Sequence, residues 1–167
     1  PSGKRQIYPG DNFDYHLKPF REAINNGLRV IMPYYGIPVG QTDEDVAMGF
    51  NKMILTDLLR DELGFTGVVC ADWGIVSSRT WGVEHLTIKQ RYKKSLDAGM
   101  DQYGGESDTQ SVVELVEEGQ ISEARINLSV KRILINKFEM GLFEQSLVDE
   151  EILPQLVNKP EYIQAGL

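Results

Sequence analysis

The apolar positions of this chain alternate between short uninterrupted runs and helical spacings. Three short runs predict buried strands, at Val30–Met32, Gly67–Ala71 and Met100–Tyr103. Apolar residues at helical spacing predict helices through about residues 20–28, 50–63, 87–98, 112–118 and 122–138. Strands that recur at intervals of roughly 35 residues, with helices between them, are typical of βα repeats in a parallel sheet. The pattern therefore predicts an α/β fold.

Polar, proline and glycine positions predict where these elements begin and end. Residues 1–17 are polar and turn-rich, and Pro19 is expected in the first turn of the first helix. The segment Thr42–Asp45 resembles a capping box with Asp in the Glu position, and it is expected to open the second helix. Gly64 is expected to close that helix, and Thr87–Gln90 to open the next one.

Composition narrows the class of protein. The chain has 167 residues, of which 41% are hydrophobic, enough for one domain with a core. A net charge of -8 argues against a nucleic-acid partner. The single cysteine, Cys70, excludes an internal disulfide and is expected to pack as a small apolar residue. No apolar run is long enough for a membrane span, and no His or Cys spacing favours a metal. No cofactor is therefore predicted.

The length of the chain limits how complete the fold can be. A (β/α)₈ TIM-type barrel needs about 250 residues, so residues 1–143 are expected to form about half of one. Residues 144–167, which include Pro154 and Pro160, are expected to form a linker. We expect a fragment of a longer protein, since the chain also lacks an initiator Met. Open edges of a partial barrel predict possible self-association.

The strongest candidate for chemistry lies directly after the second predicted strand. Gly67–Ala71 reads as a strand buried on both faces, and Asp72, Trp73 and Gly74 follow it. A charge cannot help the core, whereas the carboxyl ends of parallel strands face the ligand crevice in α/β folds. This position favours Asp72 as a catalytic carboxylate. The alternative that remains open is a helix-capping or exposed loop acid.

Four segments carry a resemblance to a known family. The run Leu58–Trp73 contains a Leu-Arg helix end, Gly-Phe-Thr-Gly, an apolar strand and Ala-Asp-Trp, and it resembles glycoside hydrolase family 3. Met32–Tyr35 and Ala98–Asp101 are similar to that family's Met-x-x-Tyr and Ala-Gly-x-Asp patterns. The helix from Arg125 to Ile133 adds to the likeness, which extends from about His16 to the end of the chain.

The resemblance implies retaining hydrolysis of β-glycosides of the glucose or xylose type. Asp72 would be the nucleophile that forms the covalent glycosyl-enzyme intermediate. Trp73 would present an apolar face to the sugar, and Tyr35 would hydrogen-bond near the nucleophile and keep it ionised. Met32 would contact the sugar, although its simplest interpretation is a core residue, and the adjacent Tyr34 is expected to point away from Tyr35. The expected partner is a carbohydrate substrate.

The resemblance also implies that part of the active site is absent from this chain. Retention needs a second carboxyl about 5–5.5 Å from the nucleophile, and in most of the family it comes from a second α/β domain, which residues 144–167 would lead to. The N-acetylglucosaminidase branch uses a His/Asp dyad instead. Residues 9–12 and 14–16 resemble only the edges of that stretch, without the catalytic His. The chain alone is therefore expected to be inactive.

Other residues near the predicted strand ends are further functional candidates. Glu106 lies after the third predicted strand and could be the missing acid, while Trp81 and His85 follow the second strand. Gly104–Gly105 lacks the companion residues of a phosphate loop. Two other functions remain open: a sugar-binding or assembly module without turnover, and an aldolase, which would need a strand-end lysine. The compartment of the parent protein is left open between periplasmic and secreted.

Overall fold

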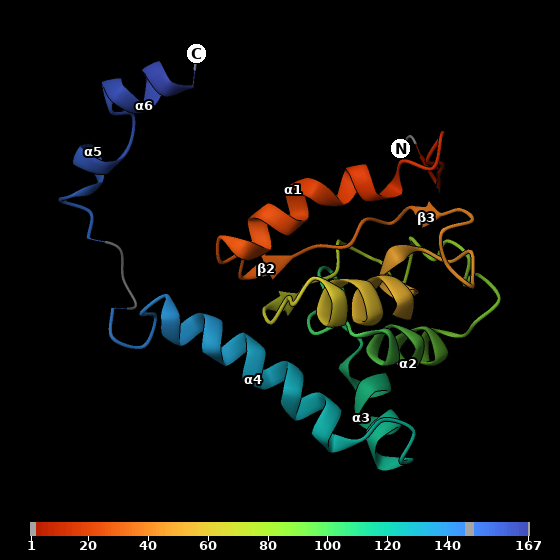
Figure 1. Cartoon of the computed structure of the whole chain (residues 1–167). Coiled ribbons are helices and arrows are strands. Elements are labelled where there is room, and N and C mark those ends of the chain that lie inside the picture. The colour runs from red at the N-terminus through yellow and green to blue at the C-terminus, as the bar shows by residue number, and fades with distance from the viewer. Residues whose placement is uncertain (1–2, 146–148, 167) are drawn as a thin grey trace. The chain divides into compact units, whose positions relative to one another are not determined.

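The computed structural model describes residues 3–145 and 149–166, in two compact units, Pro1–Asn136 and Lys137–Leu167 (Figure 1). The first unit is a mixed α/β structure with short parallel strands. Its elements are β1 (Arg5–Gln6), α1 (Phe13–Asn25), β2 (Val30–Ile31), β3 (Ile37–Pro38), η1 (Met48–Phe50), η2 (Met53–Glu62), β4 (Val68–Val69), α2 (Ile88–Ala98) and α3 (Thr109–Glu117).

The remaining helices lie toward the end of the chain. Helix α4 (Glu123–Glu139) begins in the first unit and ends in the second, which also contains α5 (Leu153–Leu156) and α6 (Pro160–Ala165). The expected linker at 144–167 thus includes two short helices, and its residues 146–148 and 167 lie outside the described residues. Within the described chain, no helix is both long and apolar enough to cross a lipid bilayer.

Two of the three predicted strands are confirmed, and they lie side by side. β2 pairs with β4 in parallel, with Val30 opposite Val68, and an isolated parallel bridge joins Cys70 to Gln102. The third predicted strand, Met100–Tyr103, is reduced to that bridge. Both Asp101 and Gln102 donate their backbone N–H to the carbonyl of Val69, so the regular ladder is interrupted there. The three segments nevertheless leave the sheet at the same edge.

Sequence patterns missed a second pair of strands. β1 pairs with β3 in parallel, with Arg5 opposite Ile37, and β1 lies within the polar, turn-rich residues 1–17, where no strand was predicted. Each strand has only two residues, too few for an alternating pattern to appear in the sequence. Among the described residues, these pairs do not close into a barrel.

Helix boundaries were predicted unevenly. Helix α1 begins at Phe13, so the prediction that Pro19 lies in its first turn is wrong. Pro19 lies inside the helix, where it lacks the N–H that would bond to the carbonyl of Tyr15. Helix α2 does begin after Thr87, which forms a capping box with Gln90.

The capping box expected at Thr42–Asp45 is not formed. The segment is followed by the short 3₁₀ helix η1, and the longer helix η2, a π-helix, begins only at Met53. The Thr42 hydroxyl donates instead to the carbonyl of Glu44 and accepts from the amide of Asn51, which is fully buried. These hydrogen bonds stabilise a loop. The Thr42 side chain is therefore bonded within that loop and does not cap a helix.

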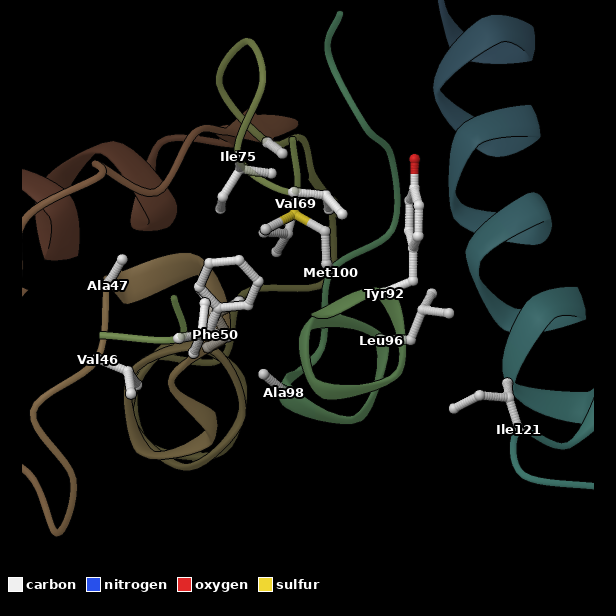
Figure 2. Packing of buried hydrophobic residues seen from close by; sticks show 14 of the residues in the cluster. Val46, Ala47, Phe50, Val69, Ile75, Tyr92, Leu96, Ala98, Met100 and Ile121 are labelled. Atoms are coloured by element: carbon white, nitrogen blue, oxygen red, sulfur yellow. The ribbon is translucent and has the colours of Figure 1, made fainter. Parts of the chain in front are cut away.

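The core of the first unit collects side chains from β4, η1, α2 and the loops beside them. Figure 2 shows Phe50, Val69, Ile75 and Met100 pointing toward one another, all at most 1% exposed. Cys70, which was expected to pack as a small apolar residue, is a free cysteine and is partly buried. Val68 and Val69 point to opposite faces of β4 and are both buried, so the strand is covered on both faces.

Candidate active site

Asp72 lies three residues beyond β4, at the edge where the parallel segments end. Its side chain is half-buried, and its Oδ1 accepts the backbone N–H of Trp73 at 2.7 Å. The residues that follow form turns, and the next helix in the chain is α2. The helix-capping alternative therefore does not describe Asp72.

Tyr35 comes from the segment after β2 and reaches across to Asp72 and Trp73. Its hydroxyl donates to the backbone carbonyl of Trp73 at 2.5 Å. Burial raises the pKa of Tyr35 to about 12, helped by a hydrogen bond and the negative charge of Asp72 and opposed by the positive charge of Arg79. The hydroxyl therefore stays protonated at neutral pH and can act as a hydrogen-bond donor beside the carboxylate.

Arg79 is a cation in this group that the sequence did not predict. The guanidinium of Arg79 lies 5.5 Å from the ring centre of Tyr35, within cation–π range. Its only sequence signal was its place in the irregular segment after the second strand. Trp81 packs edge-to-face against Tyr35 at 6.1 Å, so this candidate is brought to the same group.

A charged pair borders the aromatic residues. Lys4 lies 6.0 Å from the ring of Trp81 and donates to Glu84 at 2.7 Å. The hydrogen bond from Lys4 lowers the pKa of Glu84. His85, another sequence candidate, is exposed on the same loop. The edge thus presents aromatic rings and charges of both signs.

Trp73 is the most exposed aromatic residue of this group. Its side chain is 69% exposed, and one side of the indole lies against Gly104 and Gly105. An exposed indole held beside a carboxylate offers a flat apolar surface next to a reactive oxygen. Gly104 and Gly105 are therefore neighbours of Trp73 rather than parts of a phosphate loop.

Met32 lies in different surroundings. It is 53% exposed, which makes its simplest interpretation as a core residue wrong, and with Tyr34 it lines an apolar groove of about 480 Å³. The groove lies between α1, the end of β2 and η2. Tyr34 faces this groove while Tyr35 bonds to Trp73, as expected for neighbours that point in different directions.

Glu106 is engaged by the loop that follows Asp72. Its Oε1 accepts the backbone N–H of Val76 at 2.7 Å and that of Ser77 at 3.0 Å. A carboxylate held by two amides stabilises loop structure. In the part of the chain that the structure describes, no three His, Cys, Asp or Glu side chains gather in a way that could hold a metal ion.

Comparison with known proteins assigns the chain to a family. The profile described as "Glycosyl hydrolase family 3 N terminal domain" matches residues 6–135. The chain therefore belongs to this family, as its sequence resemblance predicted. The match includes Tyr35, Asp72, Trp73 and the segment that contains Glu106.

Curated relatives and solved structures agree with this assignment. The chain is 48% identical to probable beta-glucosidase C of Aspergillus oryzae, over 98% of this chain and 27% of that protein. It is 36% identical to a periplasmic beta-glucosidase/beta-xylosidase of Dickeya chrysanthemi, over 97% and 28%. A beta-glucosidase involved in saponin metabolism, from intestinal bacteria, superposes with a TM-score of 0.75 at 29% identity, over 89% and 19%. The chain spans about a quarter of the length of these curated relatives.

Proposed function

We propose that this chain is the nucleophile-bearing part of a retaining β-glycosidase. The observation that carries the proposal is the position of Asp72 at the carboxyl end of β4, with Tyr35 and Trp73 held beside it. Membership of glycosyl hydrolase family 3 supports the same class of reaction. The expected substrates are terminal β-linked sugars of the glucose or xylose type, which agrees with the names of the relatives.

The geometry supports specific roles for the side chains. Asp72 would attack the anomeric carbon and displace the leaving group, which gives a covalent glycosyl-enzyme that water then hydrolyses. Tyr35, protonated at working pH, would donate beside Asp72, while the exposed face of Trp73 would contact the sugar ring. Met32 would contact the sugar from the end of β2, where it is 53% exposed and lines the apolar groove.

The second carboxyl required for retention is expected from outside this chain. We assign residues 1–143 to part of a (β/α)₈ TIM-type barrel, and 144–167 to a linker toward a second α/β domain. The β2–β4–Gln102 order supports the barrel assignment, since successive parallel segments lie side by side. In this proposal the chain alone does not turn over substrate.

A sugar-binding module without turnover is the second candidate. One observation favours it: the carboxylates of Glu84 and Glu106 are engaged by Lys4 and by loop amides. The aromatic surface of Trp73, Trp81 and Tyr35 would then bind a sugar that no acid activates.

A trapping experiment separates the two candidates. A protein of the relatives' length that contains this chain is incubated with a 2-deoxy-2-fluoro-β-glucoside, digested and mapped by mass spectrometry. We expect the label on the peptide with Asp72, no label in Asp72→Ala, and normal labelling in Asp61→Ala, which changes an exposed acid at the end of η2. A label on another acid contradicts the Asp72 assignment, and binding without turnover or label favours the binding module.

A further inference from the structure

The segment after the Cys70–Gln102 bridge runs alongside the residues that follow β4. Ala71 donates its backbone N–H to the carbonyl of Gln102 at 2.8 Å, and Gly74 donates to the carbonyl of Gly104 at 3.1 Å. Asp72 and Trp73 lie between these two bonds. The backbone on both sides of the proposed nucleophile is therefore fixed to the same neighbouring segment.

Two glycines allow this segment to lie directly against the indole of Trp73. A Cβ atom on Gly104 would lie 2.7 Å from Trp73 Cε3 and 2.8 Å from the carbonyl oxygen of Ala71. A Cβ atom on Gly105 would clash with Trp73 Cδ1, and Gly105 has φ +65°, a conformation that disfavours other residues. Any side chain at either position would displace the indole.

Glu106 bonds to the same loop slightly further along the chain, beginning at Val76, two residues after Gly74. Its Oε1 accepts the N–H groups of Val76 and Ser77 and the Ser77 hydroxyl, the last at 3.3 Å. Val76 is fully buried, so its N–H would otherwise be cut off from water. Hydrogen bonds therefore join residues 71–77 to residues 102–106 both just after β4 and in the turn that follows Asp72.

We propose that Gly104, Gly105 and Glu106 form a positioning seat for Trp73 and the Asp72 loop. The two glycines supply the surface on which the indole rests, and Glu106 holds the turn that closes the loop against it. Glu106 is in this view a positioning residue that works through backbone amides, with no proton-transfer role. The link to catalysis rests on the proposed β-glycosidase function, whereas the position of Trp73 can be measured without it.

The first test observes Trp73 directly in the 167-residue chain. The chain has two tryptophans, so 5-fluorotryptophan labelling gives two ¹⁹F resonances, which Trp73→Phe assigns. We expect Gly105→Ala to shift or broaden the Trp73 resonance and to leave that of Trp81 in place as a sign of intact folding. Gly119→Ala is the matched control, because Gly119 has φ +68° but no atom within 4 Å of an added Cβ.

If Gly105→Ala does not fold, Glu106→Ala tests the position of Trp73 instead, because the Glu106 substitution adds no backbone strain. We expect it to move the Trp73 resonance, whereas Glu106→Gln should leave that resonance near its original position, since an amide oxygen still accepts both N–H groups. A Trp73 resonance that stays unmoved in both Gly105→Ala and Glu106→Ala overturns the proposal.

The second test is kinetic, in a protein of the relatives' length. A displaced nucleophile loop is expected to lower kcat about 100-fold in Glu106→Ala, and Glu106→Gln should restore most of the loss. A Glu106→Gln variant as inactive as Glu106→Ala, with an unmoved Trp73 resonance, overturns the positioning role and indicates an acid–base role. If the unsubstituted protein shows no turnover, the proposed function fails. The ¹⁹F comparison then still tests whether Gly105 and Glu106 position Trp73.

Discussion

A single hydroxyl, that of Tyr35, joins two of the three parallel segments at the candidate site. Tyr35 lies in the segment after β2, and its hydroxyl donates to the carbonyl of Trp73. The pKa of this hydroxyl is raised by the negative charge of Asp72. Because the carboxylate disfavours a second negative charge nearby, the two groups are linked electrostatically. A change of charge at Asp72 should therefore be visible in the ionisation of Tyr35.

We expect Asp72→Asn to lower the pKa of Tyr35 from about 12 part of the way toward its ordinary value. Burial is the largest cause of the raised pKa and would remain, while the effects of the Asp72 charge and hydrogen bond would be lost. The measurement is tyrosinate absorbance at about pH 11, where ordinary tyrosines are already ionised. The contribution of Tyr35 is isolated by subtracting the same data for Tyr35→Phe.

The raised pKa of Tyr35 also makes the stability of the folded chain depend on pH. With a raised pKa the folded chain holds the Tyr35 proton more tightly than the unfolded chain does, so this stabilisation is lost as pH rises from 10 through 12. Because the onset of the loss is set by the pKa of the unfolded chain, the loss in Asp72→Asn should be smaller and should be complete at a lower pH. An unchanged absorbance difference in Asp72→Asn would show that Tyr35 and Asp72 do not interact in solution.

Individual site residues differed in how well the sequence predicted them. Asp72 and Trp73 follow an apolar strand in a distinctive run, so both position and resemblance pointed to them. Arg79 and the amide-binding role of Glu106 were missed, because they depend on turns in irregular segments. Such contacts arise from tertiary packing and leave no periodic pattern in the sequence.

At the scale of elements, the buried carboxylate of Asp101 ties β4 to two helices. Its side chain is fully buried and forms ion pairs with Arg60 of η2 at 2.6 Å and Arg132 of α4 at 2.9 Å. It also accepts the backbone N–H of Val69 at 3.0 Å. Burial lowers the pKa of Arg60, and the Asp101 charge opposes that shift. The strand that leads to Asp72 is thus fixed by charge as well as by packing.

We expect Asp101→Asn to lower the free energy of unfolding by about 3 kcal/mol, because partly buried arginines would lose their counter-charge. Urea-induced unfolding at neutral pH, followed by tryptophan fluorescence, measures this. The control is Asp97→Asn, which breaks the more exposed pair with Lys93 and should cost less than about 1 kcal/mol. Equal losses in the two variants would contradict the role assigned to Asp101.

The sequence predicted helices better than strands. Helices α2 and α4 appeared close to their observed bounds because repeated apolar spacing extends over many residues. Each strand of the β1–β3 pair has only two residues, and the interruption of the ladder occurs at the single residue Asp101. Their formation is decided by which segments meet in space, which the chain order alone does not specify.

At the scale of the whole chain, the first prediction concerns activity. We expect the 167-residue chain to leave an aryl β-glucoside intact, whereas a protein of the relatives' length that contains it hydrolyses the compound. The physical reason is the second carboxyl that retention requires, combined with the engagement of Glu106 by Val76 and Ser77. Release of the aryl group is the measurement. Turnover by the chain alone, lost in Asp72→Ala, would show that it carries its own acid–base residue.

The second whole-chain prediction concerns self-association, which the structure supports through an open edge and an apolar groove. β2 lies at one end of its two-stranded sheet, with Val30 43% exposed, and the groove of about 480 Å³ adjoins it. Exposed strand edges favour pairing with another chain. We therefore expect the sedimentation coefficient of the 167-residue chain to rise with protein concentration.

A charge on the edge should prevent this association. Val30→Lys places an ammonium group beside the edge of β2, where pairing would bury it, so the chain should sediment as a monomer over the same concentrations. Val113→Lys is the matched control, because Val113 is similarly exposed at 47% but lies on α3. Association that persists in Val30→Lys and disappears in Val113→Lys would place the contact on α3 instead of on the open edge.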